Sequence, residues 1–265
     1  RPPMDYSLAG MKALVCGSTQ GIGRACATQI ARAGAEVVLM ARHAGALAKA
    51  CDELPCKHDQ SHDYIVADFS DWQMVQEKAN DYVSTNGPIQ ILVNNTGGPP
   101  AGPVFEATPD DLLKAFTMHI VCNQVLVQAL AGEMRKAGYG RIINIISTSV
   151  VAPIRGLGVS NTTRGAVANW ARTLAGELGP FGITVNNILP GYTGTARLSS
   201  LIKGRADRAG SSMKEIEDGM IANVPLRRFA EPQEIGAVAA FLASPAASYL
   251  NGLNLPVDGG RLAWQ

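Results

Sequence analysis

Two hydrophobic patterns alternate along the chain. Short runs of apolar, mostly β-branched residues are typical of buried strands, and longer stretches with apolar residues every three to four positions are typical of amphipathic helices. The first pattern predicts strands at 13–16, 37–40, 64–66, 91–94, 142–146 and 184–189. The second predicts helices that begin at Ile22 and Trp72, one around Leu47, one through Val125 and Leu130, and one through Trp170 and Leu178.

This alternation predicts the class of fold. Near-continuously apolar strands joined by helical crossovers form a parallel sheet that helices cover on both faces. We expect a single doubly wound α/β domain over residues 8–265, preceded by an N-terminal extension at 1–7. Ligands of such sheets bind beyond the carboxyl ends of the strands, where this chain is rich in glycine, asparagine, serine and proline.

One stretch departs from the pattern. Residues 198–224 are polar and charged and contain three spaced glycines, Gly204, Gly210 and Gly219. Segments that open and close over a binding pocket have this character. We therefore expect a mobile helical flap that shapes the choice of substrate.

The charge balance limits the classes of partner. The 23 basic and 22 acidic residues give a formal net charge of +1, and no basic run is long enough to favour nucleic acid or an anionic membrane surface. No continuous apolar run approaches the roughly 20 residues of a membrane-spanning helix. The start of the chain lacks the pattern of a signal peptide. We expect a cytoplasmic protein that binds a small molecule.

A cluster of cysteines and histidines needs a separate test as a metal site. Cys51, Cys56, His58 and His62 occur close together in a predicted connection between a helix and a strand. Their spacing matches no usual zinc pattern. We expect no metal site.

A glycine-rich loop follows the first predicted strand and precedes the first predicted helix. Glycine lets the backbone approach a pyrophosphate closely, and the amino end of a helix favours its negative charge. The loop therefore predicts a dinucleotide site. Its residues are Gly17, Ser18, Thr19, Gln20, Gly21, Ile22 and Gly23.

Three further motifs follow in order: Asn94-Asn95-Thr96-Gly97, Pro190-Gly191 and Val257-Asp258-Gly259-Gly260. With the G-x-x-x-G-I-G loop they resemble the short-chain dehydrogenase/reductase family over nearly all of residues 8–262, and their order is most like the 3-oxoacyl-carrier-protein reductase branch. The resemblance implies a Rossmann-type fold, hydride transfer with a nicotinamide cofactor, and assembly into a homodimer or homotetramer. It also implies cofactor contacts at Asp68, Asn94, Thr96, Gly97, Pro190, Gly191 and Thr195, with Asn94 and Asn95 mainly bracing the sheet.

The end of the second predicted strand indicates which cofactor is preferred. Enzymes that use NAD place an acidic residue there to bind the ribose hydroxyls, whereas this chain has Ala41 followed by Arg42. A guanidinium without a neighbouring carboxylate suits the 2'-phosphate of NADP. We expect NADP(H) to be favoured over NAD(H).

The segment 141–164 lines up with the catalytic segment of the family but lacks its usual tyrosine and lysine. Ser147 occupies the position of the catalytic serine, whereas Ser160 stands at the tyrosine position and Arg164 at the lysine position. The resemblance places His119 where relatives have the asparagine of the proton relay. None of the six tyrosines is followed by a lysine four residues later, so no shifted alignment restores the motif.

These replacements change the available chemistry. A serine hydroxyl is far less acidic than a phenol, whose pKa is about 10. Arg164 can hold the cofactor ribose and supply a fixed positive charge, but it stays protonated and cannot relay a proton. This combination suits a substrate with a carboxylate, or a conjugated carbonyl that develops enolate charge when hydride adds to carbon. Water, His119 or Tyr192 would then protonate the carbon, and Arg155 and Tyr192 are the candidates for substrate contact.

The sequence leaves three functions open. The first is an NADP(H)-dependent oxidoreductase that reduces either a C=O or a C=C bond. The second is a cofactor-binding sensor or partner protein with impaired catalysis, and the third is a lyase or isomerase on the same scaffold. His119 also has two interpretations, as a residue of the site or as a hydrogen-bonded core histidine.

Overall fold

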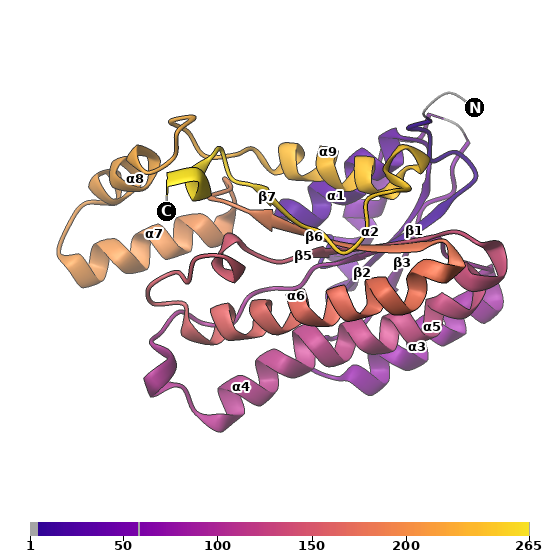
Figure 1. Cartoon of the computed structure of the whole chain (residues 1–265), viewed down its shortest axis with the longest axis horizontal. Helices are drawn as coiled ribbons and strands as arrows, with labels where there is room; N and C mark the ends of the chain where they lie inside the picture. Colours follow the sequence, from indigo (N-terminus) through magenta and orange to yellow (C-terminus); the bar gives the residue numbers. More distant parts are fainter. Residues whose placement is uncertain (1–4, 58, 265) are drawn as a thin grey trace.

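The fold is a seven-stranded parallel sheet between two layers of helices (Figure 1). The computed structural model describes residues 5–57 and 59–264. The strands are β1 (Lys12–Cys16), β2 (Glu36–Ala41), β3 (Asp63–Val66), β4 (Ile91–Asn94), β5 (Gly140–Ile145), β6 (Ile183–Pro190) and β7 (Asn254–Val257). The α-helices are α1 (Gly21–Arg32), α2 (Ala44–Asp52), α3 (Trp72–Asn86), α4 (Pro109–Phe116), α5 (Cys122–Ala137), α6 (Gly158–Leu178), α7 (Ala196–Ala209), α8 (Met213–Ala222) and α9 (Pro232–Ala243).

The order of the strands confirms the predicted doubly wound sheet. It is β3-β2-β1-β4-β5-β6-β7, so the chain winds outwards in both directions from β1 and β4 at the centre. The direction of winding changes between these two strands. A ligand of such a sheet binds in the crevice beyond their carboxyl ends.

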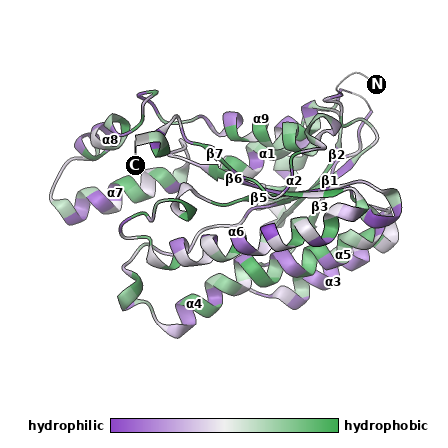
Figure 2. Ribbon diagram, viewed as in Figure 1, coloured by the Kyte–Doolittle hydropathy of each residue, from purple (hydrophilic) through white to green (hydrophobic). Residues whose placement is uncertain are grey.

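The two faces of the sheet bury separate hydrophobic cores. In β1, Val15 packs with Ile30 of α1 and with residues of α9 on one face. Leu14 packs with Leu126 of α5 and with residues of α3 on the other. The alternation follows from the period-two geometry of a strand. The helices accordingly carry both apolar and polar residues along their length (Figure 2).

On the second face, α4 and α5 form one long helical segment that contains a π-helical turn at Thr117–Val121. α4 starts at a capping box between Thr108 and Asp111. α5 is capped at its carboxyl end by Gly138, whose φ is 63°. By length and composition alone, the helical segment Pro109–Ala137 could cross a membrane. Half of its most apolar window is buried inside the fold, and the core helix of a globular domain meets the same criteria.

The segment expected to form a flap contains most of α7 and all of α8 (Figure 1). Leu198, Ile202 and Met220 form a small buried cluster, against which Tyr192 and Phe229 pack. Although this segment is mostly polar, these apolar side chains pack the two helices beside Tyr192. That the flap moves stays a prediction.

Candidate active site

The glycine-rich loop between β1 and α1 has the shape and the free donors that a pyrophosphate needs. Gly17 and Gly21 have φ values of 57° and 56°, which residues with a side chain rarely adopt. A Cβ atom on Gly17 would lie 2.5 Å from the backbone oxygen of Asn95. α1 begins without a side-chain cap or an acidic residue in its first turn, so its first N–H groups are available to an anion. These residues fit a dinucleotide cofactor.

Gly23→Ala is expected to weaken NADPH binding more than about tenfold. A Cβ atom there would meet the carbonyl oxygen of Gly17 and lie 2.6 Å from Nδ2 of Asn95, so the loop would have to move. Titration of NADPH fluorescence measures the change in Kd. Gly132→Ala in α5 is the matched control, because nothing lies within 4 Å of a Cβ at that position. Equal Kd values for the two variants would contradict the assignment.

The glycine-rich loop is hydrogen-bonded to β2, the strand that precedes Arg42. Ser18 is fully buried, and its hydroxyl oxygen accepts a hydrogen bond from the Met40 N–H at 3.2 Å. Arg42 follows β2 directly and is exposed. The guanidinium predicted to bind a 2'-phosphate therefore stands at the open end of the same strand.

Asp68 lies after β3 and is held as an anion. One of its carboxylate oxygens accepts hydrogen bonds from the Ser70 N–H and from the Ser70 hydroxyl, both at 2.9 Å. These bonds, with a smaller effect of Arg42, lower the pKa of Asp68. Asp68 does not cap the next helix, because Asp71 caps α3 by accepting a hydrogen bond from the Met74 N–H.

The later motifs of the sequence meet at the same edge of the sheet. Pro190 ends β6, and the N–H of Gly191 donates to the carbonyl oxygen of Val257 at 3.0 Å. Thr195 caps α7, and its methyl carbon lies 3.4 Å from the place of a Cβ on Gly21. Thr195 is thus beside the glycine-rich loop, and its contact with the cofactor stays a prediction.

A line of asparagine side chains crosses the sheet from β4 to β7. Asn94 donates to Asn144 at 2.8 Å, Asn144 donates to Asn187 at 2.9 Å, and Asn187 donates to Asn254 at 2.8 Å. In each of these bonds the donor lies on the side of β4 and the acceptor on the side of β7. The side-chain oxygen of Asn94, at the start of the line, is therefore buried without a partner among the described residues. The line braces the four strands and ends at the candidate site.

His119 lies in the π-helical turn and is only 3% exposed. Its Nδ1 is 2.8 Å from the hydroxyl oxygen of Thr96, whereas its Nε2 is buried without a hydrogen-bond partner within the part of the chain that is described. Burial lowers the pKa of the imidazole well below its usual range, the charges of Arg164 and Arg197 lower it further, and the backbone of Gly97 acts in the opposite direction. The ring is therefore neutral at pH 7.

The buried state of His119 predicts how stability depends on pH. Its pKa in the folded protein is below the unfolded value of about 6.5, so acidification below that value protonates the unfolded chain first and lowers the free energy of unfolding. His119→Asn removes this contribution. Between about pH 7 and about pH 5.5, the Tm of the natural protein should fall more than that of the variant. Parallel curves would contradict a neutral, buried His119.

Arg164 projects from α6 into the same region. Its Nη1 donates to the carbonyl oxygen of Ile145 at 2.7 Å. Burial, and then the charge of Arg197, lower the pKa of its guanidinium to about 10, so the cation persists at pH 7. Arg164 and His119 line one small cavity of about 10 Å³, room for roughly one water molecule. Its other lining residues are Asn94, Asn95, Thr96, Asn123, Asn144, Ile145, Ile146 and Val167.

The two candidate serines lie on elements that pack against each other. Ser147 follows β5, and its hydroxyl oxygen accepts a hydrogen bond from the Ser149 N–H at 3.1 Å. Ser160 is in the first turn of α6 and is 7% exposed. Arg155 is exposed in the loop before α6 and is not among the residues that line the cavity. Its contact with substrate stays a prediction.

Tyr192 is held between two side chains. The ring of Phe229 meets it edge-on at a centroid distance of 6.0 Å, and the guanidinium of Arg261 lies 4.9 Å from its centroid. Arg261 also donates to the hydroxyl of Thr148 at 3.3 Å. Sequence reasoning missed Arg261, because a lone arginine after a glycine pair carries no periodic signal.

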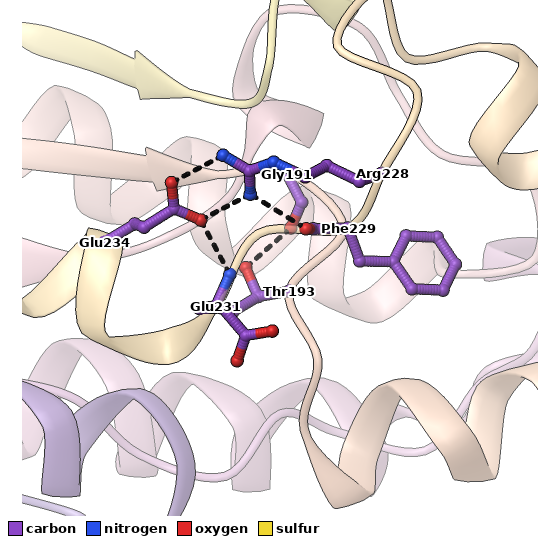
Figure 3. A network of polar contacts seen from close by, with 6 residues as sticks. All are labelled: Gly191, Thr193, Arg228, Phe229, Glu231 and Glu234. Carbon is purple, nitrogen blue, oxygen red and sulfur yellow. Dashed lines mark hydrogen bonds and ion pairs between the residues drawn. The ribbon is translucent and has the colours of Figure 1, made fainter.

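A second network fixes the segment that carries Phe229 (Figure 3). Arg228 pairs with both carboxylate oxygens of Glu234 at 2.6 and 2.7 Å, and Glu234 accepts a hydrogen bond from the Glu231 N–H at 2.8 Å. The N–H of Ala230 donates to the carbonyl oxygen of Tyr192 at 2.9 Å. Figure 3 shows this network together with Gly191 and Thr193.

The described side chains of the cysteine and histidine cluster contact nearby backbone groups. Both ring nitrogens of His62 contact backbone, Nδ1 accepting from the Val37 N–H and Nε2 lying near the Pro55 carbonyl oxygen, each at 3.1 Å. The Cys56 thiol is 3.2 Å from the carbonyl oxygen of Gln60. His58 lies outside the described residues. Within those residues, no group of three or more His, Cys, Asp or Glu side chains is arranged to hold a metal ion.

A match to a known family covers nearly the whole chain, from the glycine-rich loop to the last of the sequence motifs. A family model described as enoyl-(acyl carrier protein) reductase matches residues 17–261. The chain belongs to the short-chain dehydrogenase/reductase family. This short-chain dehydrogenase/reductase is an NAD(P)-dependent oxidoreductase.

Its relatives match over nearly their whole length. The chain is 33% identical over 258 residues to gluconate 5-dehydrogenase of Gluconobacter oxydans, with 97% of each chain covered. It is 34% identical over 258 residues to 7α-hydroxysteroid dehydrogenase of Escherichia coli, with 97% of this chain and 96% of the relative covered. The structure of L-sorbose reductase from Gluconobacter frateurii, complexed with NADPH and L-sorbose, has a TM-score of 0.91 at 31% identity and covers 98% and 99% of the two chains.

Proposed function

We propose that this enzyme uses NADPH to reduce a carbon–carbon double bond conjugated to a carbonyl group. The cavity lined by His119 and Arg164 carries the proposal. It contains a fixed cation and a neutral imidazole, but its described lining includes neither a phenol nor an ammonium group. Reduction of a ketone needs an acid that protonates the oxygen, whereas conjugate addition of hydride needs only stabilisation of charge on that oxygen. The matching family model is itself named for enoyl reduction.

The residues of the site have separate tasks in this reaction. Bound NADPH supplies the hydride. Negative charge then develops on the carbonyl oxygen of the substrate, and the buried Arg164 cation stabilises it where the dielectric is low. The hydroxyls of Ser147 and Ser160 donate hydrogen bonds to the same oxygen. Water protonates the α-carbon afterwards, so the missing phenol is not required.

Matched pairs of substrates test this proposal. NADPH oxidation is measured with cyclohexenone and cyclohexanone, and with an unsaturated and a saturated open-chain ketone. We expect kcat/KM to be at least about tenfold higher for each conjugated compound. Equal or faster turnover of the saturated ketones would overturn the proposal. Tight NADPH binding without turnover of either class would instead support the impaired, cofactor-binding alternative.

Arg42→Leu is expected to weaken NADPH binding by about ten- to a hundredfold, because a charge-assisted hydrogen bond to a phosphate contributes about 1.5–3 kcal/mol. NADH lacks the 2'-phosphate, so its affinity should change little. Fluorescence titration of both cofactors against both proteins gives the comparison. A parallel loss for NADPH and NADH would contradict a preference for NADP(H) that rests on Arg42.

Three further properties rest on relatives or on composition. The expected homodimer or homotetramer and the cytoplasmic location stay predictions, and so does the flap's control of substrate choice. Size-exclusion chromatography with light scattering tests the assembly.

A further inference from the structure

Arg197 joins the start of α7, just before the flap, to the loop that follows β4. It is the second residue of α7, and its Nη1 donates to the carbonyl oxygen of Gly98 while its Nη2 donates to that of Pro99, both at 3.1 Å. Gly98 and Arg197 are far apart in sequence. The same loop contains Thr96, the hydrogen-bond partner of His119, so the contact brings a guanidinium close to the candidate active site.

The guanidinium of Arg197 occupies the space beside Gly98. A Cβ atom on Gly98 would lie 2.6 Å from Nη2 and 2.8 Å from Cζ of Arg197. A side chain at position 98 would therefore displace the guanidinium from its present place.

The site concentrates positive charge without an acidic partner. The charge of Arg197 acts on both Arg164 and His119. In the described part of the chain, no carboxylate lies within 4.0 Å of Arg164 or Arg197. The carbonyl groups of Gly98 and Pro99 solvate Arg197 but do not neutralise it. An anion bound to Arg197 would supply the missing negative charge and accept the remaining N–H donors of its guanidinium group.

We propose that Arg197 binds a carboxylate of the substrate beside the loop that follows β4. Arg197 is exposed and able to meet an entering ligand, while Arg164 stabilises the carbonyl oxygen of the same substrate. That this carboxylate belongs to the substrate of a hydride transfer rests on the proposed function. The substrate is then a carboxylic acid that also contains a carbonyl group conjugated to a C=C bond. The phosphates of the cofactor carry the same kind of anionic oxygen, so the test separates the two sources.

The test compares β-acetylacrylate with its methyl ester, which share the same conjugated system. The natural protein should turn over the acid with a kcat/KM at least about tenfold above that of the ester. Arg197→Met should abolish this ratio while leaving ester turnover and the Kd of NADPH within about threefold. Arg32→Met is the matched control, because Arg32 is an exposed arginine in the last turn of α1 with no assigned role in the site, and it should keep the ratio.

Two outcomes would overturn the assignment. One is an unchanged acid-to-ester ratio in a folded Arg197→Met protein. The other is a loss of NADPH affinity with the ratio kept, which would assign the anion to the cofactor. If neither compound is reduced, calorimetric binding of β-acetylacrylate to the NADP⁺ complex still decides the matter. If Arg197→Met abolishes this binding, the carboxylate site is supported although the proposed reaction fails. If the substitution leaves the binding unchanged, the site is refuted.

Discussion

Arg164→Met is expected to lower kcat/KM for a conjugated carbonyl substrate by about 100- to 1,000-fold, which is the usual effect of removing a group that stabilises a developing oxyanion. Arg164 is the cation of the cavity and is bonded to the Ile145 carbonyl oxygen, so its charge is held in place before the substrate arrives. Methionine has a similar length but carries no charge. Steady-state kinetics of NADPH oxidation measures the loss.

The control variants separate charge from shape. Arg164→Lys keeps a positive charge in the cavity and should retain far more activity than Arg164→Met. Unfolding curves and the Kd of NADPH identify any loss caused by the unpaired Ile145 carbonyl group instead of by catalysis. If folded Arg164→Met kept a kcat/KM within about threefold of the natural value, Arg164 would not stabilise the transition state.

The double variant Ser160→Tyr/Arg164→Lys is expected to gain reduction of simple ketones by at least about tenfold, with NADPH. A phenol at position 160 restores an acid of suitable pKa, and a lysine at position 164 restores a group that relays protons. Ketone reduction should then depend on pH as the new phenol titrates. Reduction of conjugated compounds needs no phenol and should not rise in parallel.

The single variants complete this comparison. Ser160→Tyr and Arg164→Lys alone should gain little ketone activity, because the phenol and the ammonium group act as a unit. His119 remains at the asparagine position in all of them, so the gain stays partial. A folded double variant that binds NADPH and shows no ketone activity would contradict the alignment of Ser160 with the tyrosine position.

Apolar patterns predicted six of the seven strands of the sheet, but not β7 and not the exact strand boundaries. The strand predicted from residue 142 begins at Gly140 and includes Arg141, which is buried. The guanidinium of Arg141 lies 4.0 Å from the ring centroid of Tyr139, and Nη1 donates to the carbonyl oxygen of Gly140 at 2.8 Å. A hydropathy pattern treats such an arginine as exposed, since it cannot anticipate a partner supplied by folding.

The candidate site was predictable where local sequence makes local structure. The glycine loop is set by residues close in sequence, so it could be predicted before the fold was known. Contacts between residues that are distant in sequence could not be predicted. The Thr96–His119 hydrogen bond and the bonds from Arg197 to the loop after β4 join positions that only the folded sheet brings together.

The most direct test of the central claim is the position of the transferred hydride. NADPH that carries deuterium at its transferable position is allowed to reduce a conjugated ketone, and the product is examined by NMR. The account predicts a saturated ketone with deuterium on the carbon β to the carbonyl group. An alcohol with deuterium on the former carbonyl carbon and an intact C=C bond would contradict it.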